Sequence, residues 1–155
     1  MKQLQPLLVR LEAAIPQQAL IVPEVSNGSI GWHIEHSLLV MDAVADALQA
    51  SDPAGYKKRF DIKRNLVMAL GIIPRGRVKA PKGVQPVVQF DAASLEQHLA
   101  QTLAKLEALS QLSPGHYFTH PFMGDFKLAP ALRFLAVHTR HHVKIIGDVM
   151  KKANG

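Results

Sequence analysis

Four stretches with helical apolar spacing most constrain what this chain of 155 residues can fold into. In each stretch, apolar residues recur at the three- and four-residue intervals of an amphipathic helix. Clusters of proline, glycine, serine and aspartate separate the stretches, which cover approximately residues 3–14, 30–50, 92–110 and 129–150. Four such helices predict an all-α fold, and their lengths favour a four-helix bundle. The composition, 48% hydrophobic, suits a single domain over residues 1–155.

The connection between the second and third predicted helices is unusually long. It contains a shorter helical pattern around Arg59 to Leu70, followed by a loop punctuated by proline and glycine through Pro86. Connections in simple up-and-down bundles are shorter, and long ones are often functional. We therefore expect a long crossover between helices two and three that reaches over one end of the bundle.

The composition also excludes several classes of protein. No stretch approaches the roughly 18 continuous apolar residues of a membrane span, and the N-terminus lacks the pattern of a signal segment. We therefore expect a cytoplasmic protein that does not enter membranes. The absence of cysteine excludes disulfides, thiolate ligands and a cysteine nucleophile. Any thiol chemistry would use a thiol of the substrate.

The net charge of +6 and the pI of 9.8 raise the question of a nucleic-acid partner. Much of the excess charge lies in the basic segment 57–82, which contains Lys57, Lys58, Arg59, Lys63, Arg64, Arg75, Arg77, Lys79 and Lys82. This segment lacks the interleaved aromatic residues of a single-strand platform and the spacing of a helix-turn-helix or zinc finger. We interpret it as a solvated helix and loop face, with attraction of an anionic substrate as the functional alternative. Nucleic-acid binding is disfavoured.

The last predicted helix carries two histidines, His138 and His142, four residues apart on its apolar face. Imidazoles that face inward must find polar partners, because a buried polar nitrogen without one is costly. A divalent metal ion would satisfy both rings. His141 lies about 90° away around the helix, which favours a supporting role over coordination.

A metal ion needs more than two ligands, so a further ligand must come from another helix. The second helix offers His33 and His36, which both lie opposite its polar stripe of Glu35, Asp42, Asp46 and Gln49. Spacing alone does not choose between the two. A single histidine on an apolar face is usually a hydrogen-bonded core residue. The combination of an inward pair with an inward histidine on another helix favours a metal site.

The segment 115–126 is aromatic and rich in turn residues, and it leads directly into the last helix. We expect its aromatic side chains either to wall a pocket or to cap the core. His116 and His120 in this segment, and His98 on the third helix, are weaker candidates for ligands.

Three motifs resemble those of a known family. They are GWHIEHSL at residues 31–38, HPFMGDF at residues 120–126 and HTRHH at residues 138–142. Together they resemble the DinB/YfiT-like superfamily of metalloenzymes, and within it a subfamily with an HP-x-x-G segment before an H-x-x-H-H helix. The resemblance covers nearly the whole chain in the order of its elements.

The resemblance implies a four-helix bundle that holds a divalent cation, commonly zinc or nickel, with three histidines. Carried over by position, the ligands are His36, His138 and His142, with His33 as the alternative to His36. Some relatives are transferases that use low-molecular-weight thiols, and others are isomerases or hydrolases. The chain departs from the family pattern at Val143-Lys144-Ile145, where Arg-Gly-Gln is frequent, so substrate contacts are not carried over.

Three neutral histidines would leave a divalent ion with an open coordination position, as in catalytic zinc sites. We therefore expect a metal-dependent enzyme that acts on a small molecule, by hydrolysis or by transfer to a thiol. His141 or His33 could act as a proton shuttle or orient a ligand, and Glu35 is a weaker candidate for a general base. The alternative is a metal- or ligand-binding helical bundle without catalysis. The second helix is apolar around much of its circumference, which would also suit a homodimer.

Overall fold

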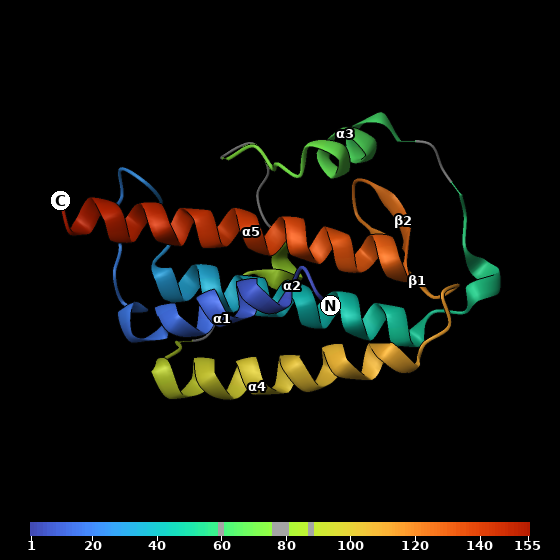
Figure 1. Ribbon diagram of the computed structural model, residues 1–155, viewed down its shortest axis with the longest axis horizontal. Coiled ribbons are helices and arrows are strands. Elements are labelled where there is room, and N and C mark those ends of the chain that lie inside the picture. Colours follow the sequence, from blue (N-terminus) through green and yellow to red (C-terminus); the bar gives the residue numbers. More distant parts are fainter. Residues whose placement is uncertain (59–60, 76–80, 87–88) are drawn as a thin grey trace.

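The computed structural model describes residues 1–58, 61–75, 81–86 and 89–155, and it is mostly helical (Figure 1). The described residues form five α-helices and one small antiparallel sheet: α1 (Gln5–Ala14), α2 (Ile30–Ala50), α3 (Ile62–Leu70), α4 (Ala92–Ala108), β1 (Tyr117–His120), β2 (Gly124–Lys127) and α5 (Leu128–Ala153). Short 3₁₀ turns lie between them: η1 (Ile15–Gln17), η2 (Pro53–Gly55), η3 (Lys82–Val84) and η4 (Leu109–Gln111). The predicted helical fold is confirmed.

Local sequence explains where the helices begin. α2 starts after Ser29, whose hydroxyl accepts a hydrogen bond from the N–H of Trp32 at 3.1 Å. α4 starts with a reciprocal capping box, in which the side chains of Asp91 and Ser94 each accept from the backbone N–H of the other. These caps satisfy backbone donors that the first turn of a helix leaves unpaired.

α2 is the central helix of the core, because it packs against both α4 and α5, while α1 packs against α5. Figure 1 shows α1, α2, α4 and α5 running along the long axis of the molecule. Fully buried side chains from all four helices fill the space between them, including Leu11, Leu38, Leu106 and Leu135. Truncation of such a residue to alanine costs about 2–5 kcal/mol. This core holds α2 and α5 in fixed register, and both carry candidate ligands.

The expectation of an all-α fold is wrong for the segment that precedes α5. β1 and β2 form an antiparallel hairpin in which Phe118 pairs with Phe126. The turn uses Gly124 with a φ of 69°, a conformation that favours glycine. Phe118 and Phe126 are buried, and both rings lie against Phe134 of α5. The aromatic residues therefore cap the core at this end, which was one of the two expectations.

α3 and the residues that follow it, as far as Arg75, lie against α5. The predicted helix at 59–70 is present as α3, while residues 59–60 lie outside the described part. Arg133 of α5 donates a hydrogen bond of 2.8 Å to the carbonyl of Met68, and Asp148 pairs with Arg75 at 2.6 Å. Residues 68–75 are thus fastened to α5 at two places. No helix in the described residues is long and apolar enough to cross a membrane.

Candidate metal centre

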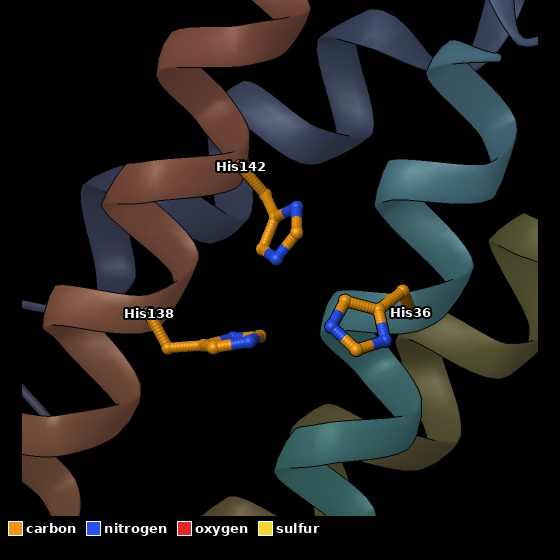
Figure 2. Close-up of side chains that lie close together, drawn as sticks. All are labelled: His36, His138 and His142. Carbon is orange, nitrogen blue, oxygen red and sulfur yellow. The ribbon is translucent and has the colours of Figure 1, made fainter. Parts of the chain in front are cut away.

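Three histidine side chains from two helices meet inside the protein. α2 contributes His36, and α5 contributes His138 and His142, which lie one helical turn apart. Each offers one ring nitrogen, and these nitrogens all lie within 4.8 Å of one another. Figure 2 shows the three rings pointing into the same space between the two helices. This histidine cluster, as we call the three residues, could hold a metal ion.

The ring of His36 is oriented from its far side. Its Nδ1 donates a hydrogen bond of 2.7 Å to the carbonyl oxygen of Val84 in η3. A neutral imidazole with its proton on Nδ1 has a free lone pair on Nε2, which is the form that binds metals. The indole of Trp32 stacks on the same ring, with 5.1 Å between centroids. The tautomer and the position of this ring are therefore both constrained.

His142 is oriented by a second histidine. Its Nδ1 lies 3.0 Å from Nδ1 of His33, so one of these nitrogens donates to the other. Nε2 of His33 lies 2.9 Å from Oγ of Ser26, which also accepts from the N–H of Gly28. Both ring nitrogens of His33 are therefore engaged in hydrogen bonds, and His33 lies behind the histidine cluster rather than in it.

His138 has the least satisfied ring of the three. Its Nδ1 is closed off from solvent and has no hydrogen-bond partner in the part of the chain that the structure describes. Its centroid lies 5.1 Å from that of His36 and 4.7 Å from that of His142. A buried nitrogen without a partner costs free energy. An unpaired nitrogen beside two imidazoles with constrained tautomers fits a divalent metal ion.

The environment keeps the cluster neutral. Burial is the largest cause, and it lowers the pKa of His36, His138 and His142 below the ordinary value of 6.5. Burial also lowers the pKa of His33 to about 4. Metal ions bind the neutral form of imidazole. The lone pairs of these rings therefore stay available at neutral pH.

His141 lies beside the cluster. Its half-buried ring is 5.0 Å from the ring of His142, measured between centroids. Burial and the nearby Arg75 lower the pKa of His141, whereas a hydrogen bond with the backbone of Ile73 raises it. The segment that follows α3 thus covers His141 and brings a cation to the edge of the cluster.

The polar stripe of α2 faces α4 and not the histidine cluster. Nδ1 of His98 lies 2.8 Å from a carboxylate oxygen of Glu35, and Nε2 lies 3.4 Å from Asp42. Lys105 pairs with Asp42 at 3.2 Å and with Asp46 at 3.0 Å. We call these five residues the carboxylate cluster. The hydrogen bond to Glu35 is the largest of the effects that raise the pKa of His98.

The two remaining candidates, His116 and His120, are not part of the histidine cluster. Nδ1 of His116 lies 3.0 Å from the carbonyl oxygen of Leu48 and forms a hydrogen bond with it. His120 packs edge-on against Phe134, and its Nδ1 accepts from the N–H of Phe122 at 3.1 Å. Burial lowers the pKa of His120 to about 4.

The basic segment 57–82 is divided between several places. Arg75 pairs with Asp148, and Arg64 donates to the carbonyl of Asp125 at 3.3 Å. Lys57, Lys58 and Lys82 are exposed. Arg59, Arg77, Lys79 and the side chain of Lys63 lie outside the described part of the chain. Among the described cations of this segment, Arg75 and Arg64 thus contact different parts of the protein, and the three lysines face solvent.

Sequence reasoning missed the residues that orient the cluster. Val84 acts through its backbone carbonyl, which any residue could supply, so the sequence contains no signal for it. Ser26 lies seven residues before His33 and contacts it, but a serine just before a helix is also an ordinary capping residue. A hydroxyl before an inward histidine was the only available hint.

The fold and site define a helical protein with an internal three-histidine cluster that could hold a metal ion. The family profile of the DinB superfamily matches residues 2–146. The chain therefore belongs to the DinB superfamily, as its motifs predicted. The narrower subfamily stays a prediction. No curated protein and no solved structure matches the chain.

Proposed function

We propose that this protein is a divalent-metal-dependent enzyme that acts on a small molecule, with His36, His138 and His142 as its ligands. The observation that carries the proposal is the convergence of three neutral imidazoles, one of which has an unpaired internal nitrogen. Zinc or nickel is the expected metal, since both accept imidazole ligands. His36 is preferred to His33 because both nitrogens of His33 already have partners.

When bound by three neutral ligands, a divalent cation supplies Lewis-acid chemistry and lowers the pKa of a water or thiol in its open position. The chain's own residues prepare the site for it. Coordination through Nε2 of His142 requires its Nδ1 to donate to His33, and His33 then donates from Nε2 to Ser26. His33 thus orients a ligand, in the way that a carboxylate or carbonyl often does.

We propose hydrolysis or transfer to a thiol as the reaction. The chain has no cysteine, so the thiol would be a small partner molecule of low molecular weight. His141 is the candidate proton shuttle, because its half-buried imidazole lies next to the ring of His142 and can exchange protons. A cytoplasmic location and a homodimer are part of the same proposal, and nucleic acid is not an expected partner.

The proposal includes the finer description of the fold. α1, α2, α4 and α5 would form the four-helix bundle of one domain, residues 1–155, and the chain between α2 and α4 would be its crossover. Two observations support this: α2 packs on α4 and α5, and His36 is bonded to η3 in that connection.

A metal-binding protein without catalysis is the second candidate. It is favoured by the position of the two surface grooves, one beside β2 and α3 and one between α1 and α5. Neither groove is lined by His36, His138 or His142. These two grooves therefore do not bring a substrate to the cluster.

Elemental analysis of protein purified without an affinity tag or chelator tests the metal centre. About one zinc, nickel or similar ion per chain is expected, and none in the His138→Ala/His142→Ala variant. A wild-type protein that neither contains nor takes up zinc or nickel would overturn the proposal. If the ion is present, turnover of thiol acceptors or hydrolysable esters that depends on it separates the enzyme from the non-catalytic protein.

A further inference from the structure

A groove of about 590 Å³ lies between α3, β2 and the start of α5. It is lined by Tyr56, Arg64, Asn65, Met68, Pro114, Asp125, Phe126, Lys127, Ala129, Pro130 and Arg133. These residues come from four separate parts of the chain, and none of them belongs to the histidine cluster or the carboxylate cluster. The metal proposal leaves this groove without a role.

The groove is strongly cationic. Among the described residues that line it, Arg64, Lys127 and Arg133 are positively charged, and Asp125 is the only acid. Asp125 already accepts hydrogen bonds at both carboxylate oxygens, from the backbone N–H of Lys57 and from the hydroxyl of Thr119. Lys127 and Arg133 form no ion pair with a carboxylate among the described residues. Two positive charges therefore remain in excess within one concave surface.

Contacts within the groove hold these cations in place. The ammonium of Lys127 lies 4.6 Å from the centre of the Tyr56 ring, and the guanidinium of Arg64 lies 5.6 Å from that of Phe126. Arg133 donates to the carbonyl of Met68 through one nitrogen only. A guanidinium has five donors, so Arg133 keeps several for a ligand.

We propose that this groove binds a small molecule through its phosphate group. The excess of two positive charges matches a phosphate dianion, and guanidinium groups bind phosphate oxygens in pairs. The N-terminus of α5 adds positive electrostatic potential from the helix dipole, and its N-cap residue, Lys127, makes no side-chain capping hydrogen bond that would offset it. This inference goes beyond the proposed function and does not depend on a metal ion.

Titration with inorganic phosphate, followed by backbone amide NMR at constant ionic strength, tests the proposal. Saturable shifts are expected for amides that line the groove, including those of Tyr56, Asn65 and Ala129. The Lys127→Gln/Arg133→Gln variant should bind at least about tenfold more weakly, because it loses two charge-assisted contacts to the phosphate. Both side chains are exposed, so the variant should fold.

The matched control is Lys151→Gln/Lys152→Gln, which removes the same charge from exposed positions at the other end of α5. It should bind phosphate like the wild type. Asn65→Lys places a fourth cation on the groove wall and should tighten binding about threefold. This gain keeps the test decisive even if the double variant is unstable.

Three outcomes would overturn the proposal. They are an absence of saturable shifts, shifts that both double variants lose equally, and shifts confined to the amides around His36 and His138. Repeating the titration with and without added zinc distinguishes the two proposals, since groove binding should be the same in both. Loss of the metal centre would leave this result untouched.

Discussion

Histidine side chains lie on two opposite faces of α2, and the surroundings on each face shift the pKa of the imidazole in opposite directions. Toward α5, burial lowers the pKa of His36, and its neighbours are other histidines. Toward α4, the carboxylate cluster raises the pKa of His98. The residue type is the same, but neighbouring carboxylates favour the cation while a desolvated group of imidazoles favours the neutral base. Among the described residues, the group that could hold a metal ion lies on the neutral face.

The largest effect that separates the two faces should come from His36. We expect His36→Ala to remove metal binding, since it deletes one of three proposed ligands, whereas His98→Ala on the other face should leave metal content unchanged. Zinc affinity measured against a competing chelator would show the difference. If His33→Ala abolished binding and His36→Ala did not, the choice of ligand on α2 would be reversed.

A smaller loss should follow from Ser26→Ala. Without its hydroxyl, His33 loses the partner that fixes its tautomer, and His142 is then less well oriented. Partners behind a ligand typically contribute 10–100-fold to metal affinity, and we expect about tenfold for this more remote residue. Ser110→Ala, at an exposed site on η4, is the matched control and should have no effect. Equal affinities for both variants would remove Ser26 from the site.

Two histidines that burial keeps neutral, His33 and His120, should make the metal-free protein sensitive to acid. Because the pKa of His33 and of His120 is lowered to about 4, the unfolded chain binds protons more readily than the folded one. Stability from this source is complete above pH 6.5 and is lost as the pH falls from 6.5 to 4. His120→Gln cannot ionise there and should reduce this loss by about 1–2 kcal/mol, as measured by urea unfolding at several pH values. If His120→Gln lost as much stability on acidification as the wild type, His120 would not be a source of the acid sensitivity.

The carboxylate cluster should give the opposite and smaller dependence on pH. The raised pKa of His98 means that its stabilisation is present below 6.5 and is lost as the pH rises through the raised value. His98→Gln should cost about 1 kcal/mol at pH 6 and less at pH 9. Gln97→Ala, at the exposed neighbouring position, should show no such trend. A His98→Gln loss that stayed constant with pH would mean that packing, and not charge, is responsible.

The helices and the α5 part of the site could be predicted because both depend on periodicity. Apolar spacing located α2, α4 and α5 closely, and the four-residue spacing of His138 and His142 placed them on one face. The hairpin was missed because its strands have four residues each, too few for a clear alternating pattern. The residue types with high strand propensity, Tyr117, Phe118 and Thr119, were its local signal.

Contacts between distant segments could not be predicted in the same way. The polar stripe of α2 packs against His98, Thr102 and Lys105 of α4, and the periodicity of one helix does not identify its partner. The spacing of those three residues on α4 is itself helical, so a search for complementary stripes would have found the pair. The bond from His36 to Val84 spans 48 positions and uses a backbone carbonyl, and no pattern of side chains reports it.

That bond joins the interior to a surface turn. The ring of His36 is 4% exposed, whereas η3 has no fully buried residue. An ion that draws electron density from Nε2 makes Nδ1–H a stronger donor, so binding on one side of the ring tightens the turn on the other side. By thermodynamic linkage, breaking the contact between the turn and His36 must lower the affinity of the cluster for the ion by the same factor. The exchange of amide hydrogens with deuterium at residues 82–85 should therefore slow when the cluster is filled, and a solvent-facing turn would report the state of the interior.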